Sequence, residues 1–241
     1  MADETFIDFK CPYCGFLASF PEDCAGRANE CPECLETIVV PNDGSEVGHK
    51  LPIPITTPRL TLRRLRQGDW KDLLEFLADA ETFRYSPAEP MDEEGVVRWL
   101  EADAAAQGTH LSSEFSLAIV LESNNKLIGH GTVSFPDQQR LQAILDVFLN
   151  RHHQRNGYAT EVVRALLDFC FQGIGLHRVA VSCDSRNVAA QRLFAKAGLR
   201  REGEFLQSHF VKGEWADKTW FALLKSEYLA KSSGTAQSKV D

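Results

Sequence analysis

The sequence has no long hydrophobic run and no basic leader, and each absence excludes a class of protein. No stretch approaches the roughly 20 apolar residues that a transmembrane helix needs. The first residues, Met1-Ala2-Asp3-Glu4, are acidic and lack the basic-then-apolar pattern of a secretory signal. We therefore expect a cytoplasmic protein with no membrane-spanning segment.

Basic charge is also scarce at the start of the chain. Residues 1–50 hold ten Asp and Glu but only three Lys and Arg, so most of the net charge of -8 lies there. Binding to a nucleic-acid backbone needs clustered Lys and Arg. Nucleic acid is therefore not an expected partner of this segment.

What is present indicates one full domain and a small module. The length of 241 residues and the hydrophobic fraction of 44% are those of an ordinary globular protein. Five of the seven cysteines fall within residues 11–34. We predict a cysteine module over residues 10–41, a Gly- and Pro-containing linker over 42–56, a main domain over 57–229 and a disordered tail over 230–241.

The main domain alternates strand-like and helix-like segments. Three apolar runs, Phe115–Leu121, Leu127–Phe135 and Ile144–Leu149, predict neighbouring strands. An amphipathic helix over 157–173 and a strand over Arg178–Cys183 follow. A strand meander joined to strand–helix–strand units predicts an α/β domain on a mixed sheet.

A glycine-containing turn lies between the third strand and this helix. Residues 154–161 read Gln-Arg-Asn-Gly-Tyr-Ala-Thr-Glu, with Gly157 just before the helix. A helix N-terminus offers free main-chain N–H groups and a positive dipole end to phosphate groups. Gly157 lets the main chain approach a phosphate closely. The turn therefore predicts a phosphate-binding site.

The motifs along the main domain resemble a known family. Gln154-x-x-Gly157-x-Ala159 matches the acyl-CoA signature of the GNAT N-acetyltransferase superfamily. Over residues 57–229 the chain resembles the ribosomal-protein N-terminal acetyltransferase (RimJ/RimL-like) branch of that superfamily, with motifs in the same order and spacing. These motifs are Thr57-Pro58-Arg59-Leu60-x-Leu62-Arg63, Lys126-Leu127-Ile128-Gly129, Gly157-Tyr158-Ala159-Thr160-Glu161, His177-Arg178-Val179, Asp184-x-x-Asn187-x-x-Ala190, Lys196–Gly203 and Gly213-Glu214-Trp215-x-Asp217.

The resemblance implies a fold, a co-substrate and a binding site. The implied GNAT fold has a mixed, mostly antiparallel central sheet, flanked by helices and splayed to admit CoA. Acetyl-CoA is the implied co-substrate, with its pantetheine arm along the third strand and its pyrophosphate on the turn. Asn187 is expected to hold the pantetheine, or to cap the next helix, or both. The implied cofactor-binding residues are Val147, Phe148, Leu149, Gln154, Arg155, Asn156, Gly157, Tyr158, Ala159, Thr160 and Asn187.

The expected reaction moves an acetyl group directly from acetyl-CoA to a primary amine, so a proton must leave the amine. Asp146 is the best candidate for the catalytic acceptor of that proton, and an exposed strand residue is the equally weighted alternative. Glu114 and His130 are weaker candidates. Phe194 and Ala190 stand where relatives carry Tyr and Ser, so neither can give a proton to the departing thiolate.

Those two replacements keep a second function open, that of a non-catalytic acyl-CoA sensor or adaptor with the same fold. The acceptor of an active enzyme is either a protein N-terminus, which the closest resemblance implies, or a small amine. Residues that we consider for the acceptor pocket, each also explained as core or surface, are Trp70, Trp99, Trp215 and Asp217.

The cysteine module predicts a metal site. Sixteen residues lie between Cys11-x-x-Cys14 and Cys31-x-x-Cys34, which is within the spacing of a four-thiolate zinc site, and the pattern resembles a zinc ribbon. A disulfide pair is the alternative, and it is disfavoured without a secretory signal. Cys24 could replace one of these ligands, but its isolation favours a free thiol, and Cys170 and Cys183 are interpreted as core residues.

The role of such a ribbon is open at this point. A structural Zn²⁺ is expected to supply most of the module's folding energy, and the surface is expected to bind a protein partner or the substrate protein. A third hypothesis has the ribbon bind nucleic acid while the main domain modifies a bound protein, which the acidic charge disfavours.

Overall fold

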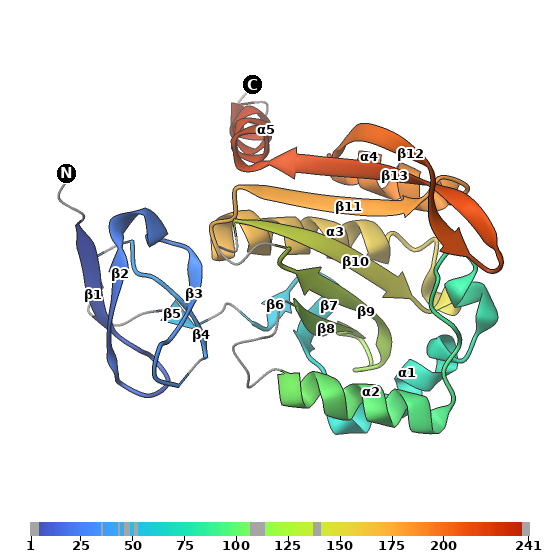
Figure 1. Ribbon diagram of the computed structural model, residues 1–241, viewed down its shortest axis with the longest axis horizontal. Helices are drawn as coiled ribbons and strands as arrows, with labels where there is room; N and C mark the ends of the chain where they lie inside the picture. Colours follow the sequence, from blue (N-terminus) through green and yellow to red (C-terminus); the bar gives the residue numbers. More distant parts are fainter. Residues whose placement is uncertain are drawn as a thin grey trace.

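The computed structural model describes residues 5–34, 36–42, 44–45, 49–50, 53–106, 114–136 and 141–237, without side chains at 49–50, 106 and 232–237. The N-terminal segment forms two small sheets beside one end of a much larger sheet (Figure 1). Within the described residues, no helix is both long enough and apolar enough to span a bilayer.

The large sheet has eight strands in the order β12-β13-β11-β10-β9-β8-β7-β6. β10 pairs with β11 in parallel, and the other neighbouring strands pair antiparallel. This is the mixed, mostly antiparallel sheet that the sequence predicts. The strands are β6 (Ile55–Thr56), β7 (Leu60–Arg64), β8 (Glu114–Leu121), β9 (Leu127–Ser134), β10 (Gln142–Leu149), β11 (Arg178–Asp184), β12 (Arg200–Val211) and β13 (Glu214–Leu224).

Helices cover both faces of this sheet (Figure 1). The first pair packs on β8 and β9, and the second pair packs on β7, β10 and the β11–β13 region, while the last helix lies against β13. The helices are α1 (Trp70–Leu77), α2 (Glu93–Ala106), α3 (Tyr158–Asp168), α4 (Val188–Ala197) and α5 (Lys225–Gln237), and a π-helical turn, η5 (Phe169–Gly173), follows α3.

Burial on both faces explains the apolar run of β8. Leu117 and Ile119 belong to the core cluster under α3 and α4, whereas Ala118 and Val120 belong to the cluster under α1 and α2. Side chains alternate along a strand, so a strand buried on both faces needs apolar residues at successive positions. The central strands are thereby fixed between two layers of helices.

The small module has two sheets of its own. One contains β1 (Phe6–Lys10) and β2 (Leu17–Pro21), and the other contains β3 (Ala28–Glu30), β4 (Thr37–Val39) and β5 (His49–Lys50). Phe9 and Ile38, from one sheet each, are buried in a small core. Ala28 and Val39 instead belong to the main core cluster, so the module packs against the large domain.

Two segments differ from the sequence prediction. Within 42–56, predicted as a linker, β5 pairs with β4 and β6 pairs with β7, because Ile53 and Ile55 pack against the main core. Disorder is predicted from residue 230, but α5 continues to Gln237. Tyr228 stacks on Phe171 with ring centroids 5.0 Å apart and anchors this helix. Residues 238–241 of the predicted tail lie outside the described residues.

Candidate active site

β10 and β11 are neighbours in the sheet but part along their length. They pair at Gln142–Ile144 against Arg178–Ala180, near the start of both strands. Beyond that point β10 stays paired with β9, whereas β11 stays paired with β13. Val147–Leu149 therefore has no partner strand on its β11 side among the described residues. Such a free strand edge can bind an extended chain through main-chain hydrogen bonds.

The glycine turn lies directly after this open edge of β10. Arg155 and Gly157 both adopt left-handed backbone conformations, with φ of 63° and 79°. α3 begins at Tyr158. Within the described chain, the main-chain N–H groups from Arg155 to Thr160 make no hydrogen bond. These free groups and the helix dipole form a site for an anion.

The side chains of the turn mostly hold the turn itself. Gln154 Nε2 donates to the carbonyl of Leu149 at 3.1 Å, and Asn156 Nδ2 donates to the carbonyl of Gln154 at 3.1 Å. Tyr158 and Ala159 pack against the main core. The predicted residues of the turn thus lie together, and what they offer to a ligand is chiefly main-chain N–H.

Asn187 lies after β11, at the open end of the gap. Its Oδ1 accepts a hydrogen bond from the main-chain N–H of Ala190 at 3.0 Å, which caps α4. Capping uses only the oxygen of the amide. The Asn187 side-chain NH₂ therefore remains available to a ligand in the gap.

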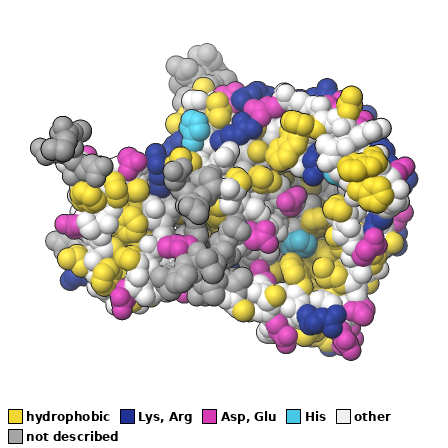
Figure 2. Space-filling model, viewed as in Figure 1, with side chains coloured by type: hydrophobic (Ala, Val, Ile, Leu, Met, Phe, Trp, Pro, Cys, Tyr) yellow, Lys and Arg dark blue, Asp and Glu magenta, His cyan; other side chains and the backbone are white. Residues whose placement is uncertain are grey.

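The face of the sheet that carries α1 and α2 is hollowed. Figure 2 shows a hollow over β9 and β10, in which a histidine and acidic side chains are visible among apolar ones. Asp146 pairs with Thr132 of β9 and lies on the same face of β10 as Phe148, whose ring is 6.0 Å from that of Phe83. The predicted proton acceptor thus lies between the open edge of β10 and this hollow.

Asp146 is the exposed residue of β10, as the alternative interpretation expects, yet neighbouring groups still disfavour its charged form. Burial of the carboxyl raises its pKa, the charge of Lys218 lowers it, and the charge of Glu114 raises it, with a net rise. A raised pKa makes the carboxylate a better proton acceptor. Lys218 on β13 was not among the residues predicted from the sequence, because only the fold brings it near Asp146.

The two weaker candidates have other surroundings. His130 is buried, its ring stacks on that of Phe148 at 5.1 Å, and burial lowers its pKa to about 4. Its Nδ1 is buried without a hydrogen-bond partner in the described chain. Glu114 accepts a hydrogen bond from Ser134 Oγ at 3.0 Å. Both belong to the hollow, and neither is as close to the open edge of β10 as Asp146.

Comparison with known proteins gives the family. The family model for the acetyltransferase (GNAT) domain matches residues 59–200. The chain belongs to the GNAT acetyltransferase family. It is an acetyl-CoA-dependent acyltransferase, with the fold that the sequence predicts.

Individual GNAT proteins are similar over the same region. An uncharacterized N-acetyltransferase of Bacillus subtilis, YnaD, is 30% identical and covers 72% of this chain and 98% of its own length. The spermidine N(1)-acetyltransferase of Vibrio cholerae is 24% identical, covering 72% and 98%. A solved GNAT acetyltransferase from Bacillus anthracis has a TM-score of 0.65 at 26% identity, covering 72% and 99%.

The GNAT domain also contains the four residues that the sequence suggests for the pocket that binds the acceptor amine. Trp99 lies 5.1 Å from the His130 ring and thus belongs to the hollow, whereas Trp70 packs against the core cluster under α1 and α2. Trp215 is exposed on β13, and Asp217 Oδ1 accepts from the main-chain N–H of Gln207 at 2.7 Å. Of these four residues, Trp99 is the one placed to touch an acceptor in the hollow.

The GNAT domain lacks a hydroxyl at the two positions where relatives carry Tyr and Ser. Phe194 is buried, and its ring lies 5.7 Å from that of Phe221. Ala190 packs against the same core. Neither side chain can donate a proton to a thiolate.

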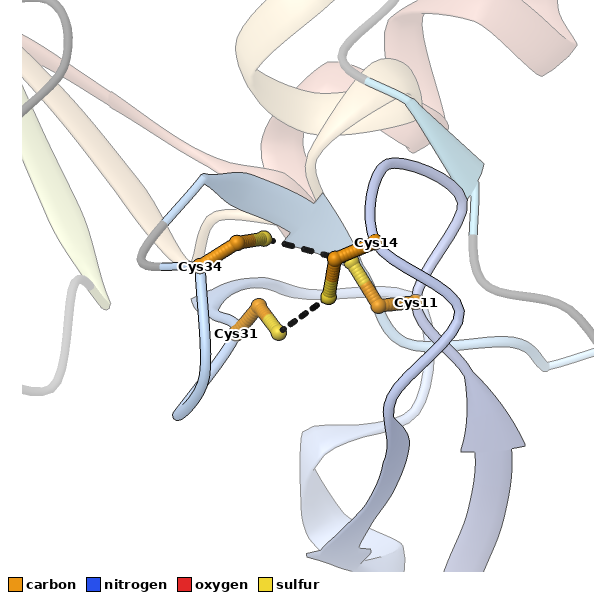
Figure 3. Close-up of side chains that lie close together, drawn as sticks. All are labelled: Cys11, Cys14, Cys31 and Cys34. Carbon is orange, nitrogen blue, oxygen red and sulfur yellow. Dashed lines mark hydrogen bonds between the residues drawn. The ribbon is translucent and has the colours of Figure 1, made fainter.

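The four predicted metal ligands lie together in the small module. Figure 3 shows their side chains converging from the turns after β1 and β3, and all four Sγ atoms lie within 4.8 Å of one another. The Sγ atoms of Cys11 and Cys34 are 3.6 Å apart, and those of Cys14 and Cys31 are 3.7 Å apart. Tetrahedral Zn–S bonds of about 2.3 Å separate sulfurs by about 3.8 Å. The arrangement therefore fits a zinc ion.

The chemistry of the cluster agrees with that fit. Burial raises the pKa of Cys31, but the main-chain N–H groups of Cys34 and Glu33 outweigh it and lower this pKa to about 7. Burial and the neighbouring thiols raise the pKa of Cys34 to about 12. Four thiolates so close together repel one another unless a cation neutralises them. Cys24 is outside this cluster, and its Sγ contacts Asp23.

Proposed function

We propose that the GNAT domain transfers an acetyl group from acetyl-CoA to a primary amine, with the pantetheine arm in the gap between β10 and β11. The observation that carries this proposal is the open edge of β10 leading into a turn of free N–H groups. The diphosphate would lie on the main-chain N–H groups of Arg155–Thr160, and the Asn187 amide would hold the pantetheine.

In the proposed reaction the amine approaches through the hollow. Its nitrogen attacks the acetyl carbonyl carbon, a C–N bond forms, and the C–S bond of the thioester then breaks. Asp146 accepts the proton that the nitrogen loses, and water supplies the proton that the CoA thiolate takes up. A main-chain N–H in Val147–Leu149 stabilises the negative charge on the carbonyl oxygen.

For the acceptor, two classes of amine are to be tested first. The similar proteins include a spermidine N(1)-acetyltransferase of Vibrio cholerae, and the similar solved structures include a spermidine N-acetyltransferase from Vibrio cholerae in complex with CoA and spermine. The RimJ/RimL-like motifs instead indicate a protein N-terminus.

We place the enzyme in the cytoplasm, whose reducing conditions keep thiols unpaired.

The test is the release of CoA thiol from acetyl-CoA with a panel of polyamines and of peptides with free N-termini. Turnover of one amine, together with calorimetric binding of CoA, is the expected result. Binding of CoA with no turnover on any amine would favour the sensor or adaptor. No binding of CoA at all would contradict the proposal itself.

We further propose that Cys11, Cys14, Cys31 and Cys34 hold a structural Zn²⁺ and that the small module is a zinc ribbon. Four cysteines leave no open coordination position, so the ion would shape the module and take no part in the transfer. Elemental analysis of untreated protein should find about one zinc per chain, and Cys31→Ser should lose it while Cys24→Ser keeps it. A Cys31→Ser protein with full zinc would contradict this assignment.

The surface of the ribbon is our candidate for contact with a protein partner. Phe6 and Leu17 on its first two strands expose 53% and 63% of their surface. Large exposed apolar side chains in a small module favour protein contact. Cross-linking from this surface to an acetylated protein substrate is the result that would support the role.

A further inference from the structure

Glu161, in the first turn of α3, is held by a segment about a hundred residues away in the sequence. Its Oε1 accepts hydrogen bonds from Thr57 Oγ1 at 2.6 Å and from the main-chain N–H of Arg59 at 3.1 Å. Its Oε2 accepts from Arg59 Nε at 2.7 Å and lies 2.6 Å from Arg59 Nη2. Both carboxylate oxygens are thus fixed by the segment that leads into β7.

Arg59 continues from Glu161 across the glycine turn. Its Nη1 donates to the carbonyl of Asn156 at 3.0 Å, and its guanidinium lies 4.5 Å from the centre of the Tyr158 ring. A Cβ atom at Gly157 would lie 3.5 Å from Arg59 Nη2. The Arg59 side chain therefore contacts Asn156 and Tyr158 and lies beside Gly157.

The hydrogen bond to Asn156 fixes the direction of an N–H group. The carbonyl of Asn156 and the N–H of Gly157 belong to one planar trans peptide, so they point in opposite directions. Because the carbonyl points toward Arg59, the N–H of Gly157 points away from Arg59. Arg155 is left-handed without being a glycine, and such a residue needs support from the surrounding structure.

We propose that Thr57, Arg59 and Glu161 form a brace that positions the N–H groups of the turn for the CoA diphosphate. In this role Arg59 and Glu161 are positioning residues, which act through the turn. The inference rests on the proposed function, since it concerns how the same site binds its co-substrate. It assigns a task to the Thr57-Pro58-Arg59 motif and to the last residue of Gly157-Tyr158-Ala159-Thr160-Glu161.

The alternative to the brace is that Arg59 binds the phosphate directly. Its side chain is 46% exposed and so is accessible to a ligand. The two roles differ in what Glu161 does. If Arg59 bound the phosphate itself, releasing it from Glu161 would leave affinity unchanged or raise it. If the brace sets the turn, losing Glu161 must weaken binding as much as losing Arg59 does.

The experiment compares Arg59→Gln, Glu161→Gln and the double variant by calorimetry with CoA and with pantetheine, which lacks the diphosphate. Glutamine has one side-chain oxygen where Glu161 has two. The donors to one of the two carboxylate oxygens, from Thr57 or from Arg59, would therefore face an NH₂ group. We expect each single variant to lose CoA affinity by about tenfold or more, and the double variant to lose little beyond that. Affinity for pantetheine should stay at the wild-type value.

Kinetics give a second readout. The KM for acetyl-CoA should rise while kcat at saturating acetyl-CoA stays the same, because the reacting atoms lie away from the brace. Arg59→Lys should not restore affinity, since one ammonium cannot reach Glu161 and Asn156 together. Arg98→Gln is the matched control, because Arg98 forms an exposed ion pair with Glu94 on α2, away from the turn.

Two results would overturn the brace. One is wild-type CoA affinity in Arg59→Gln, and the other is a Glu161→Gln variant that binds CoA as tightly as the wild type while Arg59→Gln does not. Thr57→Val removes the hydrogen bond to Glu161, together with the local bonds between the hydroxyl and the main chain of Leu60, and leaves Arg59 and Glu161 in place. It supplies a milder version of the test if either variant fails to fold. If the wild type itself does not bind CoA, the proposed function fails and the brace falls with it.

Discussion

At the scale of the residue, the ionisation of Asp146 is what the proposed chemistry depends on. A carboxylate can accept the proton of the amine only when it is ionised. Burial and the charge of Glu114 hold its pKa above the ordinary value, and Lys218 limits that rise. The rate should therefore fall as the pH drops through this raised pKa, at a higher pH than for an aspartate with the ordinary pKa.

Asp146→Asn should lower kcat/KM by about 10²–10⁴-fold, the usual contribution of a general base, with little change in CoA affinity.

Glu114→Gln should leave kcat nearly unchanged and move the acidic fall in rate to lower pH, since it removes a charge that raises the pKa of Asp146. Lys218→Met should move that fall to higher pH. The measurement is kcat/KM against pH with one acceptor throughout, so that protonation of the amine affects all variants equally.

An Asp146→Asn enzyme with wild-type rates would show that a different group accepts the proton. His130 is then the next candidate, because it lies in the same hollow. Its pKa of about 4 keeps it neutral, and so able to accept a proton, above that pH.

At the scale of the element, the close approach of β9 to β10 shapes the open edge. A Cβ atom at Gly129 would lie 2.3 Å from the carbonyl oxygen of Phe148 and 2.8 Å from Leu149 Cδ2. A main-chain oxygen cannot move away without displacing its strand. Gly129 is thus required where β10 carries the residues expected to bind pantetheine.

Gly129→Ala should therefore displace β10, lower the free energy of unfolding by about 1–3 kcal/mol and weaken binding of both CoA and pantetheine. Gly131→Ala is the matched control on the same face of β9, because its Cβ would meet nothing closer than 3.5 Å. Thermal unfolding and calorimetry measure the two effects. Equal behaviour of the two variants would contradict the proposed role of Gly129.

The elements also show what the sequence could and could not predict. The strands around β10 and the helix start at Gly157 were predictable, because they depend on local apolar patterns and on a short glycine motif. The contacts of Arg59 with Glu161 and of Gly129 with Phe148 were not, since each joins residues that are distant in the sequence. α5 was missed because its Ser- and Gln-rich composition suggested disorder, whereas the contact of Tyr228 with Phe171 depends on the fold.

At the scale of the whole molecule, the small module and the GNAT domain share a packed contact. A Cβ atom at Gly175 would lie 2.5 Å from the carbonyl oxygen of Gly26, so the two main chains touch there. Ala28 and Val39 of the module are buried in the main core cluster. The turn at Gly175 leads directly into β11, the strand that parts from β10.

Loss of the metal should therefore reach the GNAT domain, whereas the sequence alone predicts that chelation unfolds residues 10–41 and leaves the main domain folded. Without the four-thiolate centre the module should unfold and uncover the contact at Gly175, and burial of a side chain such as Val39 is worth about 1.5–3 kcal/mol. We expect Cys31→Ser, or treatment with a chelator, to lower the unfolding temperature of the whole chain and to speed hydrogen exchange at residues 174–180. Cys24→Ser is the matched control, since its thiol lies outside the cluster. Unchanged exchange at 174–180 in a metal-free protein would mean that the two parts fold independently and that the ribbon acts only through its own surface.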